Sequence, residues 1–446
     1  MKTVNHETQV QTILFTHYGD NWIRGSERCL LDLLKHLDKT CFKPLLWCNQ
    51  PIMESEAKAL GIEVVCTPFP LLFGWQAPRF DLQSFYNLIK QAEQLIKQHD
   101  IKLIHANSAA PCQWLNFVAK KCAVPLLCQL HTLYQLRDRL TLGLYQTDMV
   151  VGVSQYVVAP LYKDKKPHQQ LKVIANGIDT QRLLSQPEVN LRATGNVRIG
   201  DFVIATVGSL IKRKGVDRLI NSIAILIKKQ IPVHLVVIGN GPELENLNRQ
   251  IKALNLQRHI TLLGECENAH GILRGSADLF VSGAREEAFG LVFAEASLAG
   301  LAIVAPNIGG ISEVVQQQKN GILITDSTDK HFICTLAETV ELLYFSPIRC
   351  NAIGKNGQQH ILKNFTIEQN CKKFSDLYQQ LLTNKTVQVS RSEQLLGAGM
   401  QIRSIGIALL NAYRRAHQAV NDNPFSSDAP NNKTISNTGG GLLHEK

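Results

Sequence analysis

Hydrophobic and polar positions follow two patterns that alternate along most of this chain. Short, almost continuous apolar runs are separated by segments whose apolar residues recur at helical spacing, as in residues 26–37 ("SERCLLDLLKHL"). Buried strands that alternate with amphipathic helices are typical of a parallel sheet covered on both faces. In the first part of the chain this pattern predicts strands at 12–17, 43–48, 62–67, 101–107, 124–132 and 148–154.

The same pattern begins again near residue 200. It predicts a helix near 215–229 and strands at 202–209, 233–239, 260–264, 279–282, 302–306 and 321–325. The intervening segment, 184–201, is polar and poor in strand formers, so we place a domain boundary near 180–200. The sequence therefore predicts an α/β protein with two doubly wound domains, which bind ligands in a cleft at the carboxyl ends of their strands.

The character of the chain changes after about residue 385. Residues 393–420 form a mildly amphipathic helix candidate that contains three glycines. We interpret it as an additional packed helix, and a surface helix that touches a membrane is the alternative. The last residues are polar and rich in Gly, Ser and Asn, which predicts disorder. We therefore expect residues 386–446 to be a helical extension followed by a disordered tail.

Composition and charge narrow the class of protein. With 446 residues the chain exceeds the roughly 250–300 residues of a single core, and its 45% hydrophobic and 19% charged residues fit a globular protein. The net charge of +10 favours anionic partners such as a sugar nucleotide, a nucleic acid or an acidic membrane surface. No basic run interleaved with aromatic residues is present, so nucleic-acid binding is not expected.

Cysteine usage and apolar run length bear on the compartment. The 11 cysteines are scattered without a CxxC pair, which argues against disulfides and structural zinc and for reduced thiols in the cytoplasm. Residues 1–11 lack the build of a signal peptide, and no apolar run approaches the roughly 18 residues of a spanning helix. We expect a cytoplasmic protein that is neither exported nor membrane-spanning.

Several glycine-containing turns are candidate phosphate sites. In residues 208–215 ("GSLIKRKG") a strand ends at Gly208, and Lys212, Arg213 and Lys214 precede a helix. Helix amides together with lysines suit a diphosphate, whereas a solvated basic loop is the alternative. Weaker candidates are the turn with Gly239 and Gly241, the Asn-Gly turn at 176–179, and Gly25, followed by Ser26 as a candidate helix cap.

Two further features carry candidate chemistry. His131 follows a predicted strand on the cleft side, where it can bond a hydroxyl or a phosphate, although a structural role is common for a lone histidine. In residues 286–295 ("EEAFGLVFAE") the predicted helix begins near Phe289 and Gly290. Glu287 therefore lies before the helix and Glu295 within it. The two carboxylates would lie at different points around a ligand at the helix N-terminus, which argues against a glycosidase acid pair.

Taken together, these motifs resemble the family 4 retaining glycosyltransferases of the GT-B fold, also described as glycosyl transferases group 1. The resemblance covers roughly residues 10–380 and rests on the spacing from Glu287 to Glu295 with Phe-Gly between them. It also rests on segments 300–315, 208–220, 235–246, 260–265 and 173–183, and on the N-terminal "GSER". It implies Rossmann-like domains facing across a cleft. Residues 1–190 would be the acceptor side and 191–385 would bind the sugar nucleotide, with the last helix returning to the N-terminal domain.

The resemblance also implies roles for individual residues. Lys214 would bind the donor diphosphate, Glu287 the hydroxyls of the transferred sugar and Glu295 the ribose. Backbone amides of Phe289, Gly290 and Leu291 would face the phosphate. Gly25 would approach the diphosphate from the other domain, and His131 would lie near the sugar. Two departures stand out: Ser209 replaces a common arginine, whose contact is then missing or supplied by Lys212 or Arg213, and Arg24-Gly25 replaces a glycine pair.

The implied activity is transfer of a sugar, with retention, from a UDP- or GDP-sugar to a saccharide or lipid-linked acceptor in cell-surface polysaccharide or lipopolysaccharide synthesis. No metal or other cofactor is expected, because cations and helix amides can stabilise the leaving diphosphate. A lipid-linked acceptor would bring peripheral contact with the inner face of the membrane. The alternatives are a GT-B sugar-nucleotide epimerase and a catalytically silent sugar-nucleotide-binding assembly protein.

Overall fold

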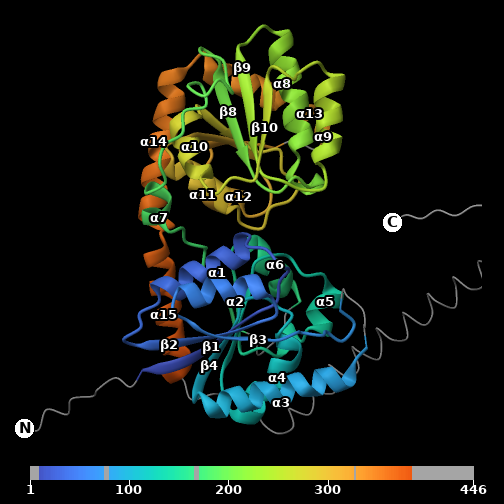
Figure 1. Cartoon of the computed structure of the whole chain (residues 1–446), viewed down its shortest axis with the longest axis vertical. Helices are drawn as coiled ribbons and strands as arrows, with labels where there is room; N and C mark the ends of the chain where they lie inside the picture. The colour runs from blue at the N-terminus through green and yellow to red at the C-terminus, as the bar shows by residue number, and fades with distance from the viewer. Residues whose placement is uncertain (1–9, 75–79, 165–169, 326–327, 384–446) are drawn as a thin grey trace, which may run out of the picture. The chain divides into compact units, whose positions relative to one another are not determined.

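The computed structural model describes residues 10–74, 80–164, 170–325 and 328–383. The predicted helix at 393–420 and the predicted tail lie outside these ranges. Within them, no helix is both long and apolar enough to cross a membrane. The described chain folds around two sheets in which every paired strand is parallel, as the repeated strand–helix pattern predicted (Figure 1).

The first sheet has seven strands in the order β3-β2-β1-β4-β5-β6-β7. Six of them were predicted, and β7 was missed because it is an edge strand that pairs only with β6 and lacks a continuous apolar run. The strands are β1 (Gln11–His17), β2 (Phe42–Cys48), β3 (Glu63–Cys66), β4 (Ile101–Ala106), β5 (Leu126–Leu130), β6 (Met149–Gly152) and β7 (Gln170–Val173).

Helices cover both faces of this sheet. Successive side chains of a strand point to opposite faces, so a continuous apolar strand has side chains to bury on each of them. In β1, Leu14 packs in the cluster that contains residues of α3 and α4, whereas Ile13 and Phe15 pack in the cluster that contains α1 and α2. The helices are α1 (Gly25–His36), α2 (Pro51–Ala59), α3 (Leu82–Gln98), α4 (Cys112–Cys122), α5 (Leu136–Thr141) and α6 (Gln155–Lys163), with a 3₁₀ turn η1 (Leu144–Gln146).

The second sheet has six strands in the order β10-β9-β8-β11-β12-β13, and all six were predicted. In both sheets the order reverses beside the first strand, which is the position where doubly wound folds bind ligands. The strands are β8 (Phe202–Val207), β9 (Val233–Ile238), β10 (Ile260–Gly264), β11 (Leu279–Val281), β12 (Ala302–Pro306) and β13 (Gly321–Ile324).

The helices that follow these strands begin near the carboxyl edge of the second sheet. The apolar faces of α8, α9 and α13 pack in one cluster with β8, β9 and β12. The elements are η2 (Lys212–Lys214), α8 (Val216–Lys228), α9 (Leu244–Ala253), α10 (Ala269–Ser276), α11 (Leu291–Leu298), α12 (Ile311–Val314), α13 (Asp329–Tyr344) and α14 (Pro347–Asn364).

The chain passes between the two sheet regions twice, and the two passages are paired. The first connection leads through α7 (Thr180–Leu184), and the second leads from α14 to α15 (Ile367–Thr383). The amide of Ile178 donates to Phe365 O at 2.9 Å, and the amide of Ile367 donates to Ile178 O at 2.9 Å. Helix α15 packs against α1 and β4 of the first sheet, where Tyr378 is fully buried.

Candidate active site

Loops at the carboxyl ends of both sheets line one cavity of about 700 Å³. His17 ends β1, while Asn107 and His131 directly follow β4 and β5. From the second sheet, Gly208 follows β8 and Gly239 follows β9. The cavity therefore lies at the strand ends, where the sequence placed the ligand.

The cavity brings together all but two of the residues that the sequence singled out. Lys212 and Gly241 are not among its lining residues, so we give them no role in binding. The candidate residues that line it are Gly25, His131, Gly208, Arg213, Lys214, Gly239, Glu287, Phe289, Gly290, Leu291 and Glu295.

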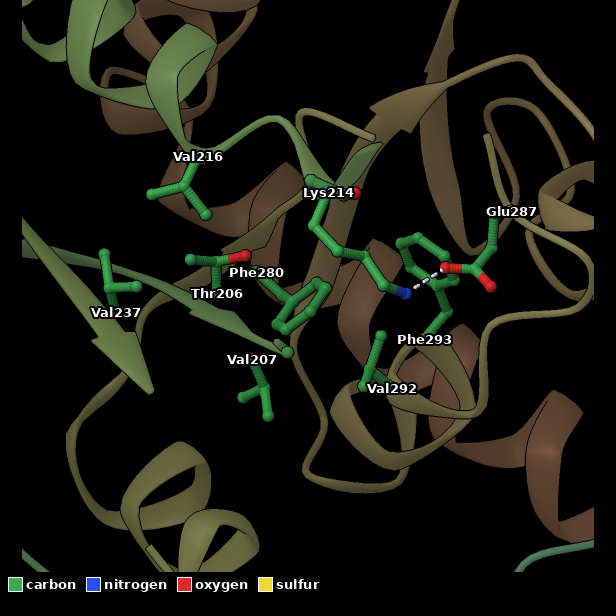
Figure 2. A pocket seen from close by; sticks show the side chains of 11 residues that line it. Thr206, Val207, Lys214, Val216, Val237, Phe280, Glu287, Val292 and Phe293 are labelled. Atoms are coloured by element: carbon green, nitrogen blue, oxygen red, sulfur yellow. Dashed lines mark hydrogen bonds and ion pairs between the residues drawn. The ribbon is translucent and has the colours of Figure 1, made fainter. Parts of the chain in front are cut away.

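Lys214 and Glu287 form an ion pair in the wall of the cavity. Lys214 Nζ lies 2.5 Å from Glu287 Oε2, and the two side chains are 22% and 10% exposed. Figure 2 shows the ammonium reaching toward the carboxylate past the Phe293 ring and Val292. At such low exposure a lone charge is costly, so each group needs the other or a ligand of matching charge.

The three basic residues of η2 point to different partners. Lys212 extends to the surface, where its Nζ lies 2.7 Å from Asp217 Oδ2. Arg213 lines the cavity and donates from Nη1 to Glu286 O at 3.1 Å. Lys212 and Arg213 were the two candidates to replace the arginine that the family commonly has at the position of Ser209. Of these two, Arg213 lines the cavity and Lys212 does not.

Two glycines beneath the 287–290 loop fix its position. The Gly310 amide donates to Glu287 O at 2.9 Å. A Cβ on Gly309 would lie 2.0 Å from the same oxygen, and Gly309 has a positive φ of 55°. The loop that carries Glu287 thus rests directly on a backbone that has room for no side chain.

The loop also contacts the N-terminus of α6, the helix that follows β6 of the first sheet. Ser154, which caps α6, donates from its hydroxyl to Ala288 O at 2.5 Å. Glu313, in α12, accepts from the amides of Gln155 and Tyr156 at 2.9 and 3.3 Å. A carboxylate at a helix N-terminus is favourable. The loop next to Glu287 and the helix α12 are therefore both bonded to the N-terminus of α6.

Glu295 lies in α11, about one turn after the helix begins at Leu291. Among the described residues its carboxylate has no hydrogen bond or ion pair, although Arg182 and Arg28 are close enough to act on it electrostatically. Removal from water raises the pKa of Glu295, and the two arginines only partly offset this. An unpaired carboxylate in a cavity wall suits hydrogen bonds from ligand hydroxyls.

We expect Glu295→Gln to raise the Tm of the protein at pH 7. The pKa of Glu295 is near 4.5 in the unfolded chain and higher in the folded protein. As the pH rises through these two pKa values, the free energy of unfolding therefore falls. Glutamine cannot ionise, so it removes this penalty. The gain should shrink toward zero at pH 4, where Glu295 is protonated in both states. Thermal melts of the two proteins at both pH values check this, and a gain that persists at pH 4 would contradict it.

The structure corrects one expectation about the first domain and specifies the charge state behind another. Ser26 does not cap α1, because the helix begins at Gly25 after Arg24, and the Ser26 hydroxyl donates instead to Glu27 at 3.0 Å. Burial lowers the pKa of His131 to about 3, so the ring is neutral at pH 7 and can bond a hydroxyl or a phosphate but adds no positive charge to the cavity.

The sequence reasoning missed several polar residues that line the cavity. His17 is the last residue of β1, and Asn107 directly follows β4, just as His131 directly follows β5. A polar residue at the end of each apolar run could therefore have identified them as cavity residues from the sequence. His270 follows the start of α10, and burial lowers its pKa to about 4. The remaining missed cations, Arg24, Arg28 and Arg182, carried no signal of this kind.

Two family descriptions match consecutive parts of the chain. Residues 23–182 match the family described as Glycosyltransferase Family 4, and residues 188–360 match the family described as Glycosyl transferases group 1. The two matched ranges meet in the connection between β7 and β8, within the segment where the sequence placed the boundary.

Individual proteins show the same similarity. The chain is 29% identical over 354 residues (75% of this chain, 88% of the relative) to a GDP-mannose-dependent alpha-(1-6)-phosphatidylinositol monomannoside mannosyltransferase of Mycolicibacterium smegmatis. It is 25% identical (65% and 67%) to a UDP-Gal:alpha-D-GlcNAc-diphosphoundecaprenol alpha-1,3-galactosyltransferase of Escherichia coli. Anabaena Alr3699/HepE, solved in complex with UDP-glucose, superposes with a TM-score of 0.69 at 21% identity (83% and 99%). The predicted GT-B fold is thereby confirmed.

Proposed function

This chain belongs to the family 4 retaining glycosyltransferases, and we propose that it moves a hexosyl group from a UDP- or GDP-sugar to a lipid-linked saccharide. The observation that carries the proposal is the Lys214–Glu287 pair in a cavity lined by the strand ends of both sheets. A cation for the diphosphate and a carboxylate for the sugar hydroxyls are thus adjacent, as the two halves of a sugar nucleotide are.

We assign the donor contacts from this geometry. Lys214 and Arg213 would face the diphosphate, together with the amides at the start of α11 near Gly290. Glu287 would accept hydrogen bonds from hydroxyls of the sugar, and Glu295 would accept from the ribose. When a donor binds, its diphosphate would become a second anionic partner for Lys214. The sugar hydroxyls would donate hydrogen bonds to Glu287 and so replace part of its contact with Lys214.

The proposed step breaks the bond between the anomeric carbon and the diphosphate oxygen, and forms a bond to the acceptor oxygen on the same face of the sugar. The acceptor hydroxyl proton passes to the departing phosphate oxygen, so no separate general base is needed. Negative charge grows on the diphosphate during this step. Preorganised cations and amides such as Lys214 and the α11 amides lower the barrier because they act most strongly on that developing charge.

The compared proteins support this choice of donor and acceptor. One relative is named for GDP-mannose and another for UDP-Gal, and the acceptors in their names are a phosphatidylinositol mannoside and a diphosphoundecaprenol-linked sugar. A lipid-linked acceptor would place this enzyme in peripheral contact with the cytoplasmic face of a membrane. The net charge of +10 suits a surface of anionic lipids.

A thermal-shift series with UDP, GDP, ADP and their sugars tests the donor site. A nucleotide at 100 times its Kd should stabilise the folded protein by about 2.7 kcal/mol, and we expect this for UDP or GDP but not for ADP. The same nucleotide should give a much smaller shift with Lys214→Ala and an unchanged shift with Lys212→Ala. No shift with any of the three diphosphates would contradict the proposed site.

Product analysis separates the transferase from its two alternatives. Incubated with the preferred sugar nucleotide and a lipid-linked saccharide, the enzyme should yield a glycosylated lipid with the anomeric configuration of the donor. Without an acceptor, at most slow hydrolysis should occur. Conversion of the donor sugar itself would indicate an epimerase, and binding without turnover over a broad acceptor panel would indicate a silent sugar-nucleotide-binding protein.

A further inference from the structure

A chain of buried hydrogen bonds leads from Glu27 to His131. Glu27 Oε1 lies 2.9 Å from His17 Nε2, His17 Nδ1 lies 3.1 Å from Asn107 Nδ2, and Asn107 Oδ1 lies 3.0 Å from His131 Nε2. His17, Glu27 and Asn107 are 1%, 4% and 1% exposed. His17, Asn107 and His131 line the cavity, whereas Glu27 lies behind them. None of the roles assigned above uses Glu27, His17 or Asn107.

The orientation of the Asn107 amide follows from the third contact of its side chain. The amide nitrogen that faces His17 also lies 3.2 Å from the backbone oxygen of Ser26. A backbone carbonyl only accepts, so the group facing it must be the NH₂ and not the oxygen. Asn107 therefore donates to His17 Nδ1, and its own oxygen accepts from His131.

Both histidine tautomers are then determined. Because His17 Nδ1 accepts from Asn107, its proton lies on Nε2, which donates to Glu27. Burial by itself would raise the pKa of Glu27, but the hydrogen bond from His17, with help from backbone groups and Ser26, lowers it, so the carboxylate is ionised. His131 donates from Nε2 to Asn107. Its Nδ1 is unprotonated and has no hydrogen-bond partner among the described residues.

We propose that Glu27, His17 and Asn107 are positioning residues that hold His131 in this tautomer, so that His131 Nδ1 accepts a hydrogen bond from a hydroxyl of the bound sugar. The proposal rests on the proposed function in so far as the ligand is a sugar. The Glu27 carboxylate thus acts through two side chains, His17 and Asn107. Through them it fixes His131 Nδ1 as a hydrogen-bond acceptor at the cavity wall.

Glu27→Gln is the sharpest test because its effect has a defined direction. Glu27 Oε2 accepts from the Arg24 amide at 3.1 Å, which can only donate, so the glutamine oxygen must take that contact. The new NH₂ group then faces His17 and donates to Nε2. His17 must carry its proton on Nδ1, so Asn107 has to turn its oxygen toward His17 and give up its hydrogen bond to Ser26 O, and His131 must accept at Nε2. The variant should move the His131 proton to Nδ1.

Long-range ¹⁵N–¹H NMR of the histidine-labelled full chain reads these tautomers without any substrate, with the His131 signals assigned by their loss in His131→Gln. We expect an Nε2-protonated His131 in the wild type and an Nδ1-protonated His131 in Glu27→Gln. An Nδ1-protonated His131 in the wild type would overturn the proposal even if the variant failed to fold. A tautomer unchanged by Glu27→Gln would also overturn it.

Kinetics test the sugar contact separately. Glu27→Gln should lower kcat/KM for the sugar nucleotide about three- to tenfold, because the sugar hydroxyl must then turn and accept from Nδ1 in place of donating to it. Glu63→Gln is the matched control, because Glu63 also lies beside a histidine, with His99 Nδ1 at 3.5 Å, but on the surface away from the cavity. Its kcat/KM should equal that of the wild type.

The two readouts fail in different ways. A reversed tautomer with unchanged kcat/KM would overturn the contact between His131 and the sugar. An Nε2-protonated His131 in a protein that transfers no sugar at all would instead count against the proposed function, and it would leave the hydrogen-bond chain in place.

Discussion

Lys214→Ala should lower kcat for glycosyl transfer by about a hundred- to a thousandfold, whereas Lys212→Ala should leave it unchanged. The two lysines belong to the same 3₁₀ turn and carry the same charge, but only Lys214 lines the cavity, where it pairs with Glu287. Lys212 pairs with Asp217 at the surface. A preorganised cation at the departing diphosphate acts mainly on the transition state, so its loss appears in kcat.

Steady-state kinetics of the two variants check this with one donor and one acceptor. Glu287→Ala is the companion variant and should lose activity by orders of magnitude, because it removes the contact to the sugar and leaves Lys214 without its carboxylate. Far-UV circular dichroism and a thermal melt establish that each variant is folded. Near-normal transfer by Glu287→Ala, or equal losses for Lys212→Ala and Lys214→Ala, would refute the site.

Gly309→Ala should lower kcat about a hundredfold or more. Its Cβ would lie 2.0 Å from Glu287 O, so the loop that carries Glu287 must move and the hydrogen bond from the Gly310 amide must break. A shift of about 1 Å in a substrate-positioning residue costs on the order of a hundredfold in rate. The positive φ of 55° adds strain of about 1–2 kcal/mol for alanine.

Gly300→Ala separates the strain from the displacement. Gly300 also has a positive φ, of 80°, but a Cβ there meets nothing within 4 Å. We expect a drop in Tm from the backbone strain alone, with kcat close to that of the wild type. If Gly300→Ala lost as much activity as Gly309→Ala, the loss would reflect general destabilisation and not the position of Glu287.

Much of the fold could be predicted because its signal is local. Strands such as β9, in which every residue is buried, are continuous apolar runs, and Gly208 and Gly239 mark the turns that follow such runs. Strand β7 escaped prediction because an edge strand buries little and its exposure alternates, so it has the composition of a loop.

The site was predictable where a residue belongs to a spaced motif and not where its role arises from folding. The eight-residue spacing of Glu287 and Glu295 straddles a helix start, and both residues line the cavity. The charge pattern of the turn does not distinguish Lys212 from Lys214, because the fold of the turn decides which one faces inward, and only the family resemblance singled out Lys214. The hydrogen-bond chain from Glu27 through His17 and Asn107 joins three distant segments, so it emerges only when β1 and β4 pair.

Because α15 packs against α1 and β4, the region around the first sheet is built from two separate stretches of the chain. Phe374, Leu377 and Tyr378 supply part of the core in which Phe15 and Phe42 are buried. A fragment ending at residue 190 would therefore leave that apolar surface open to water and to self-association. Exchange of the region around the first sheet between related transferases thus calls for two junctions, one in each passage of the chain and best made together where Ile178 pairs with Thr366.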